Sequence, residues 1–349
     1  MSEVILYSLV FVGTYLGVLV FRVWSLKNNI LDVPNERSSH VTPTPRGGGL
    51  IIVLASLFAY VIYSKITGRH FSGSYLLGAS IIALVSWLDD LFTISFVWRF
   101  LIQSLSAILI ISALGHFKEI YIPFSGNFDL SIFGPVITFI WIVWLTNAFN
   151  FMDGIDGLAG MQAVTAGIGW MIVGKVSGFE GVSVLGGVLA FSSLGFLLQN
   201  WYPAKIFMGD VGSAFLGFSF AVLPLIAERD RAGGDSILPF LPLISVSLVW
   251  LFLFDTVLTF FRRLLKGEKV WQAHREHIYQ KLVIFGYTHG FVSVLYGSTS
   301  VLTIGFLIYA LEKKGNLIIG LIFFLFLQSV GILGVLYFSK GKRIYRIGE

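Results

Sequence analysis

The chain has 349 residues, of which 56% are hydrophobic and only 12% charged, with a formal net charge of +5 and a mean hydropathy of +0.84. A soluble domain carries about 25% charged residues, so this composition excludes a soluble enzyme, a coiled coil and a disordered chain, and indicates a membrane protein. The sequence has no cysteine, which excludes a disulfide framework, a thiolate metal site and a cysteine nucleophile.

The apolar segments have the length of membrane-spanning helices. A hydrocarbon core about 30 Å thick needs about 20 apolar residues per helix. Continuous apolar runs favour helices over a transmembrane barrel, whose strands have about ten residues of alternating polarity. We predict a single all-α polytopic bundle over residues 1–349, with eleven spans at 4–24, 48–64, 74–92, 97–114, 132–149, 158–174, 182–199, 213–227, 237–261, 288–311 and 316–338.

The distribution of Lys and Arg predicts the orientation of this bundle. With the N-terminus outside, sixteen of the 24 basic residues fall on the cytoplasmic side and eight on the other. Cytoplasmic loops carry the excess of positive charge, so we expect an external N-terminus and a cytoplasmic C-terminus. Basic groups beside the membrane also favour an anionic leaflet and anionic substrates.

Five polar segments interrupt the apolar pattern, and all five lie on odd-numbered connections, which alternation places on the cytoplasmic face. The first runs from Asp32 to His40 and continues to Gly49. Its prolines prevent a regular helix, and its glycine run could present backbone amides to an anion. An ordinary loop with a basic flank is the alternative.

The second segment is the pair Asp89 and Asp90 at the end of the third span, followed by Arg99. Adjacent carboxylates beside lipid are costly unless they bind a cation or a proton, because like charges disfavour each other. We therefore predict a functional pair. A solvated helix cap is the alternative.

The third segment carries oxygen-bearing side chains three residues apart, from Asn147 through Asn150 and Asp153 to Asp156. They would form one helical stripe if the helix continued, but the glycines at 154 and 157 predict that it breaks. Carboxylate and amide oxygens suit Mg²⁺, which proteins hold with one or two carboxylates plus substrate phosphates. Polar residues that line a loop are the alternative.

The fourth segment runs from Asn200 to Ser213 and places Asp210 at the start of a helix, where a simple N-cap is the alternative. The fifth runs from Arg262 to Lys281. It contains two histidines, at 274 and 277, that share a helical face, and we favour phosphate contact over metal binding. A topogenic positive patch is the alternative.

An acidic residue inside the ninth span, Asp255, lies seven residues before Arg262. An intramembrane acid is expensive unless it is paired, so we predict that it pairs with Arg262 or Arg263.

Together the five segments predict a site at one membrane face for a metal ion and a multiply anionic, water-soluble substrate, which a hydrophobic second substrate could reach from the bilayer. A transporter is the competing class. Carriers usually place charged groups near the midplane of the bilayer, whereas only Asp255 has that position here. A scaffold gives no reason for five polar segments on one face.

In this order, the segments resemble the polyprenyl-phosphate N-acetylhexosamine-1-phosphate transferase family, membrane enzymes that start bacterial cell-wall and O-antigen synthesis and eukaryotic N-glycan synthesis. The last motif, His-Arg-Glu-His, lacks the run of histidines of the branch that transfers phospho-N-acetylmuramoyl-pentapeptide for peptidoglycan. The resemblance thus favours the O-antigen or surface-polysaccharide branch. The matching residues are Asp32-Val-Pro-Asn-x-Arg-x-x-His, Pro45-Arg-Gly-Gly, Asp89-Asp90, Asn147-x-x-Asn-x-x-Asp-Gly-Ile-Asp-Gly-Leu, Phe207-Met-Gly-Asp-x-Gly-Ser, Asp255-Thr, Arg262-Arg263 and His274-Arg-x-His.

The resemblance implies transfer of an N-acetylhexosamine 1-phosphate from UDP-GlcNAc, UDP-FucNAc or UDP-QuiNAc to undecaprenyl phosphate, with release of UMP. It implies a multi-pass protein of the bacterial inner membrane, compatible with a homodimer and without a nucleic-acid partner. Direct transfer and a covalent aspartyl route both remain open. So do the donor sugar and the position of the lipid groove.

The same resemblance assigns roles to residues of the five segments. It implies Mg²⁺, or Mn²⁺ in its place, held by Asp210 and Asn150, and an acceptor received by Asp89 or Asp90. The uridine and donor contacts would come from Asp153, Gly154, Asp156, Asn200 and Phe207, and the phosphate contacts from Arg99, His274, Arg275 and His277.

Overall fold

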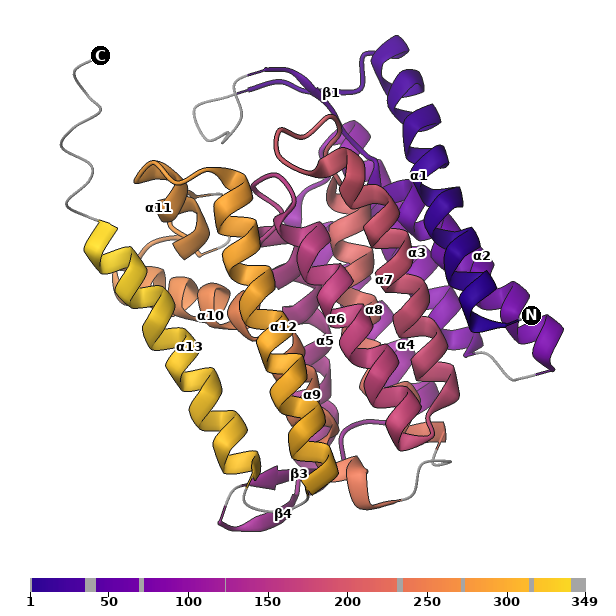
Figure 1. The fold of residues 1–349 in the computed structure, drawn as a ribbon, viewed down its shortest axis with the longest axis vertical. Coiled ribbons are helices and arrows are strands. Elements are labelled where there is room, and N and C mark those ends of the chain that lie inside the picture. The colour runs from indigo at the N-terminus through magenta and orange to yellow at the C-terminus, as the bar shows by residue number, and fades with distance from the viewer. Residues whose placement is uncertain are drawn as a thin grey trace.

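Long apolar helices make up most of the computed structural model, which describes residues 2–34, 42–68, 72–122, 124–230, 235–270, 274–313 and 317–339. Figure 1 shows them side by side as a bundle. The helices are α1 Glu3–Lys27, α2 Gly49–Thr67, α3 Gly73–Phe92, α4 Phe96–Leu114, α5 Gly134–Phe151, α6 Leu158–Ser177, α7 Glu180–Asn200, α8 Asp210–Asp230, α9 Leu241–Leu248, α10 Trp250–Leu265, α11 Ile278–Ile284, α12 His289–Lys313 and α13 Leu317–Ser339.

Two small antiparallel hairpins and two 3₁₀ turns complete the described secondary structure. The strands β1 and β2 pair Leu31 with Pro45, and β3 and β4 pair Glu119 with Asp129. The remaining bounds are β1 Leu31–Asp32, β2 Thr44–Pro45, β3 Glu119–Ile122, β4 Gly126–Asp129, η1 Ser131–Phe133 and η2 Asp235–Phe240.

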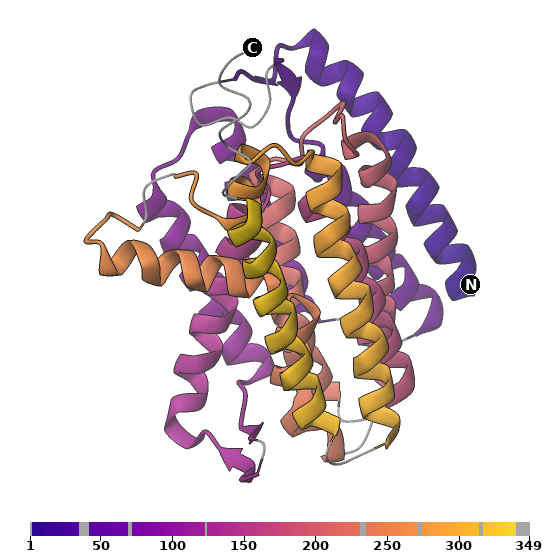
Figure 2. The ribbon, with the colours of Figure 1, turned by 60° about the vertical axis from the view of Figure 1, so that its left-hand side comes forward.

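The membrane character of the chain is confirmed by the length and composition of its helices. Within the described ranges, nine helices are long and apolar enough to cross a membrane, and the bent pair Ile237–Leu248 and Trp250–Leu265 would make a tenth span. The predicted ninth span, 237–261, is not one continuous helix, because its two halves meet at 74°. Figure 2 shows α10 projecting sideways from the bundle. The number eleven and the orientation of the termini stay predictions.

The predicted sixth span coincides with α6, which packs between α7 and α12. This helix is not among the nine that are apolar enough to cross a membrane. Thirteen of its twenty residues are buried, so protein rather than lipid surrounds most of it, and it needs fewer apolar side chains than a helix that faces lipid. Small residues bring α6 close to its neighbour: a Cβ on Gly167 would lie 2.7 Å from the carbonyl oxygen of Gly186 in α7.

The centre of the bundle is α8, in which every residue from Val211 to Ala227 is buried. It packs against α2, α3, α5 and α7. On the outside, large apolar side chains such as Phe58 (69% exposed) and Phe338 (80% exposed) face away from the protein, as expected for a surface covered by lipid.

The connections that carry the five polar segments lie at one end of the bundle, and the β3–β4 hairpin lies at the other (Figure 1). This arrangement brings the start of α8 into the middle of the polar end. The helix break predicted from the glycines at 154 and 157 is confirmed: α5 already ends at Phe151, and Gly157 has a φ of 77°, a conformation that favours glycine.

Candidate active site

The two adjacent aspartates have different surroundings. Asp90 accepts hydrogen bonds from the backbone amides of Asp210 (2.9 Å) and Val211 (3.0 Å), the first residues of α8. Its side chain is only 1% exposed. A carboxylate at this place satisfies amides that have no partner within the helix and interacts favourably with the helix dipole. Asp90 therefore caps α8 from a neighbouring helix and fixes the backbone that carries Asp210.

Two arginines hold the acidic side chains together. Arg46 Nη2 lies 2.7 Å from Asp90 Oδ1 and 2.9 Å from Asp210 Oδ1. Arg99 Nη1 lies 2.8 Å from Asp89 Oδ2 and 3.1 Å from Asp210 Oδ2. Burial opposes the charge of Arg46, but Asp90 and Asp210 outweigh it and raise the pKa of Arg46. Each oxygen of Asp210 thus faces a guanidinium group.

The end of α5 joins this cluster. The Asn150 amide donates to Ser213 Oγ (3.1 Å), three residues after Asp210 in α8. Burial, and secondly the charge of Asp210, raise the pKa of Asp153 well above its usual range. The third and fourth polar segments therefore meet at the start of α8, as the sequence predicts.

The donor chemistry at this point suits Mg²⁺, since Asp210, Asn150 and Asp153 offer carboxylate and amide oxygens. The two guanidinium groups against Asp210 show that positive charge is favourable there. Among the described residues, no group of three or more His, Cys, Asp or Glu side chains has an arrangement that would hold a metal ion. A cation could enter only if the arginines exchange Asp210 for other anions, and substrate phosphates would serve.

Two residues expected at the uridine have their polar atoms engaged within the protein. Asp156 Oδ2 accepts from the amide of Ala204 (3.0 Å), and its Oδ1 lies 3.3 Å from His289 Nδ1. Asn200 accepts from the amide of Gly157 (3.0 Å) and donates to the carbonyl of Ile206 (3.0 Å). Both tie loops together at the polar end. Their direct contact with a uridine stays a prediction, as does the contact of Phe207, which is half-buried.

The predicted use of the glycine run as an anion cradle is wrong for two of its three amides. Gly48 and Gly49 donate to the carbonyls of Phe207 (3.0 Å) and Met208 (2.9 Å). These bonds bring the first and fourth segments together, and Gly49 allows α2 to approach Gly212 of α8. The stretch from 35 to 41, with Arg37 and His40, lies outside the described residues.

The predicted pairing of Asp255 with an arginine is also wrong. Asp255 lies 3.0 Å from His277 Nδ1, whereas Arg263 Nη1 lies 2.6 Å from a carboxylate oxygen of Glu276 and Arg262 lies 3.6 Å from the other. Glu276 follows both arginines by more than a dozen residues and lies against the end of α10. Part of the positive charge in the fifth segment is thereby neutralised.

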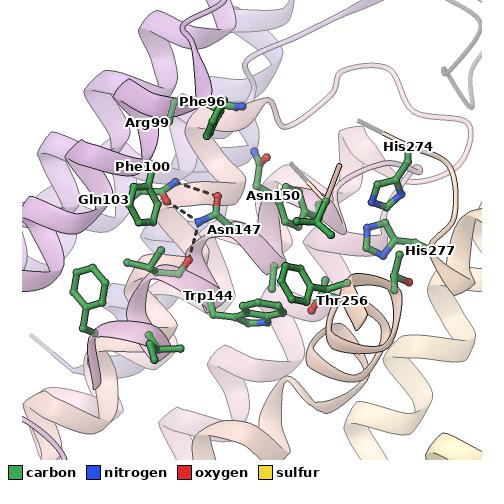
Figure 3. A pocket seen from close by; sticks show the side chains of 18 residues that line it. Phe96, Arg99, Phe100, Gln103, Trp144, Asn147, Asn150, Thr256, His274 and His277 are labelled. Atoms are coloured by element: carbon green, nitrogen blue, oxygen red, sulfur yellow. Dashed lines mark hydrogen bonds between the residues drawn. The ribbon is translucent and has the colours of Figure 1, made fainter. Parts of the chain in front are cut away.

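A cavity of about 490 Å³ lies beside the acidic cluster, between α4, α5 and α10. Figure 3 shows its polar rim, with Arg99, Asn150, His274 and His277, and the amide pair Gln103 and Asn147 below Arg99. Apart from Thr256 and Thr259, the rest of the lining is apolar and includes Phe96, Phe100, Phe139, Ile140, Val143, Trp144, Phe151 and Phe260.

The apolar part of this cavity opens toward the surface that faces lipid, since Phe100 and Phe151 are 49% exposed and Ile140 is 55% exposed. A molecule in the cavity would contact hydrocarbon along most of its length and polar groups at one end. Burial, and secondly His277, lower the pKa of His274 to about 4, so this ring is neutral at pH 7. The neighbouring Arg275 is half-buried.

Three residues that the structure brings into the site were not assigned a role from the sequence. Arg46 lies in the quoted Pro-Arg-Gly-Gly motif, which was a usable signal. Tyr279 follows the last motif, and its hydroxyl donates to the carbonyl of Phe151 (2.9 Å). Gln103 lies one turn after Arg99 and exchanges hydrogen bonds with Asn147. No motif marks Gln103, and only its helical spacing from Arg99 could have indicated it.

A bundle of apolar helices with a polar centre of aspartates and arginines beside an apolar cavity defines an integral membrane protein with a site at one membrane face. Residues 72–228 match the family model described as glycosyl transferase family 4. The chain is 33% identical over 267 residues to a Bacillus subtilis protein named "Probable undecaprenyl-phosphate N-acetylglucosaminyl 1-phosphate transferase". The matched region covers 76% of this chain and 73% of that protein.

Two further relatives extend the similarity. An undecaprenyl-phosphate alpha-N-acetylglucosaminyl 1-phosphate transferase of Haemophilus influenzae is 30% identical over 92% of both chains. A decaprenyl-phosphate N-acetylglucosaminephosphotransferase of Mycobacterium leprae is 30% identical over 81% of this chain and 77% of its own. The chain belongs to glycosyl transferase family 4, among the polyprenyl-phosphate N-acetylhexosamine-1-phosphate transferases.

Proposed function

We propose that the chain transfers N-acetylglucosamine 1-phosphate from UDP-GlcNAc to undecaprenyl phosphate and releases UMP. The observation that carries this proposal is the cavity whose polar rim adjoins the Asp210 cluster and whose apolar part opens toward lipid. A polyprenyl phosphate has this division of chemistry, with one charged end and a long hydrocarbon tail. The names of the relatives support GlcNAc as the sugar and a polyprenyl phosphate as the acceptor.

The acceptor would lie with its tail against the apolar lining and its phosphate near Arg99. An arginine suits this place because its guanidinium offers several donors in one plane. Arg99 also contacts Asp89 (2.8 Å), whereas Asp90 is committed to capping α8. We therefore assign the acceptor to Asp89, which would orient its phosphate or take a proton from it.

The donor diphosphate would lie between Asp210 and the loop that carries His274, Arg275 and His277. Phosphoryl transfer between two polyanions depends mainly on positioning and on charge neutralisation. Bound Mg²⁺ would neutralise diphosphate charge, with Asp210 and Asn150 to hold it. Arg46 and Arg99 would then be free to turn from Asp210 toward substrate phosphates.

The physiological role that follows is the first membrane step of a surface polysaccharide such as O-antigen, at the cytoplasmic face of the bacterial inner membrane. UDP-sugars are polar and approach from water, and the excess of basic residues on the predicted cytoplasmic side agrees with that direction. UDP-FucNAc and UDP-QuiNAc are the other donors to compare.

The test is transfer of radiolabel from each of the three UDP-sugars to a butanol-extractable lipid by the purified full-length protein, with undecaprenyl phosphate and Mg²⁺. We expect label from UDP-GlcNAc in the lipid, with loss of the product in EDTA and a decrease of about 10²–10³-fold in Asp210→Asn, as expected when one group that stabilises transition-state charge is removed. Lipid product from no donor, with folded protein, would refute the proposal.

Direct transfer and the covalent route are separated by exchange. Labelled UMP and UDP-GlcNAc, incubated without lipid phosphate, should exchange label only if an aspartate forms a covalent phospho-sugar intermediate. We expect no exchange, because both oxygens of Asp210 and of Asp90 are engaged by arginine or backbone donors.

A further inference from the structure

A buried carboxylate outside the Asp210 cluster, Asp255 of α10, is completely enclosed and has no place in direct contact with either proposed substrate. A buried charge persists in a protein when hydrogen bonds satisfy it. Asp255 is satisfied by donors from three helices and from the N-cap of α11: Thr259 Oγ1 (3.2 Å), His277 Nδ1 (3.0 Å), the Ile278 amide (2.9 Å), the Tyr279 amide (3.2 Å) and the Tyr296 hydroxyl (3.1 Å).

Asp255 anchors the start of α11 to α10. The two backbone amides that it accepts belong to the first residues of a seven-residue helix, which is too short to be stable on its own. The Asp255 carboxylate therefore holds the first turn of this short helix in place, and with it His277, the N-cap of the helix.

Asp255 also determines which nitrogen of His277 is available. An ionised carboxylate only accepts hydrogen bonds, so Nδ1 of His277 carries a hydrogen toward Asp255. The other nitrogen, Nε2, is left for a ligand, and the ring lines the cavity beside His274, with ring centroids 4.9 Å apart (Figure 3). In the protonated ring Nε2 carries the second hydrogen, which a phosphate oxygen can accept.

Helix α11 also contacts the end of α5 and the loop that follows it. The hydroxyl of Tyr279 donates to the carbonyl of Phe151, at the end of α5, and lies against Gly154, where it leaves no room for a side chain. The loop that carries Asp153 therefore packs on the same short helix that Asp255 holds. A displacement of α11 would move both the histidine and this loop.

We infer that Asp255 is a positioning residue of the active site: it holds Nδ1 of His277 and the start of α11, and so keeps Nε2 of His277 at the rim of the cavity, directed at a substrate phosphate. This inference rests on the proposed function for the identity of the phosphate. The orientation of His277 is a separate statement, which can be measured without substrate.

The kinetic test compares Asp255→Asn, His277→Gln, the double variant and Tyr296→Phe in the full-length protein. Loss of the outer partner of a metal-ligating histidine typically costs about 10–100-fold in activity, and we take the same scale for a histidine that contacts a phosphate. We expect a kcat decrease of this size for Asp255→Asn, a KM for UDP-GlcNAc within about threefold of wild type, and a double variant no worse than His277→Gln, since residues that act through one another are not additive.

Tyr296→Phe is the matched control, because Tyr296 donates to the carboxylate oxygen that His277 does not contact. We expect its kcat within about threefold of wild type, as for an ordinary hydrogen bond that does not reach the ring. A loss as large as that of Asp255→Asn, or losses of the two single variants that multiply in the double variant, would show a merely structural role and overturn the inference.

The orientation is tested by NMR of protein labelled with ¹⁵N at histidine, with the signals of His277 assigned by their absence in His277→Gln. We expect hydrogen on Nδ1 in wild type and a shift toward the other tautomer in Asp255→Asn. A wild-type ring with Nδ1 unprotonated would overturn the inference even if Asp255→Asn does not fold. Protein that shows the expected tautomer but transfers no sugar would refute the proposed function and leave the positioning role supported.

Discussion

Replacement of Asp90 by alanine should destabilise the protein about twice as much as replacement of Asp89. In Asp90→Ala two backbone amides at the start of α8, those of Asp210 and Val211, lose their acceptor inside the protein. A buried donor without a partner costs about 1–3 kcal/mol, so we expect a loss of roughly 2–6 kcal/mol in the free energy of unfolding. Asp89 accepts from one amide, that of Ile94 (2.5 Å), so Asp89→Ala should lose about half as much.

The assay is unfolding of the purified variants in mixed micelles with increasing SDS, followed by tryptophan fluorescence. Asp90→Asn is the graded control, since an amide oxygen still caps a helix but cannot satisfy both donors. The order of stability should be wild type, Asp90→Asn, then Asp90→Ala. Equal stability of Asp90→Ala and wild type would refute the assignment of Asp90 as the cap of α8 and return it to the candidates for direct acceptor contact.

Three further predictions follow from other parts of the structure. Val143→Trp, which fills the cavity, should raise the KM for undecaprenyl phosphate about tenfold or more and leave UDP binding unchanged, because contact with a few methylene groups of the lipid tail is lost. Ile137→Trp, on α5 outside the cavity lining, is the control. Equal effects of the two variants would contradict the acceptor site. Gly49→Ala should lower the free energy of unfolding by about 1–3 kcal/mol, because its Cβ would lie 2.4 Å from Gly212 Cα; unchanged SDS unfolding would contradict this close approach. Burial, and secondly Arg262, lower the pKa of Lys281 to about 8, so between pH 8 and about 10 the unfolded chain holds a proton that the folded chain has lost, and stability should rise with pH in this window. Lys281→Gln should flatten that rise, and an identical slope in thermal unfolding of variant and wild type would count against it.

The helices could be predicted from the sequence because their lengths are dictated by the thickness of the bilayer. The break in the ninth span could not. Val249 separates α9 from α10 with a φ of −125°, and neither proline nor glycine stands there to signal it. The bend leaves the apolar character of the segment unchanged, so a rule based on hydropathy has nothing to detect. The cavity depends on this bend, because α10 forms one of its walls.

The polar segments were predicted to converge, and their contacts confirm this, but their partners were harder to predict. Spacing within a helix identifies neighbours one turn away, whereas Asp255 and His277 are 22 residues apart and meet only through the fold. Arg262 is the nearer charged residue to Asp255 in the sequence, but in the structure it lies beside Glu276 instead. The same limit applies to Gly48, whose amide meets a carbonyl of a loop more than a hundred residues away.

Because the cavity between α4, α5 and α10 opens sideways toward lipid, the concentration that matters for the proposed acceptor is its concentration in the membrane. A lipid that enters through half-exposed Phe100 and Ile140 arrives by diffusion in the plane of the membrane. Its supply is then set by its mole fraction among the surrounding lipids, while the nucleotide sugar is counted per volume of water. Added inert lipid would lower the occupancy of the site by the acceptor even if the molar concentrations of both substrates stayed constant. The rate would therefore depend on the surface concentration of the acceptor and on the bulk concentration of the nucleotide sugar.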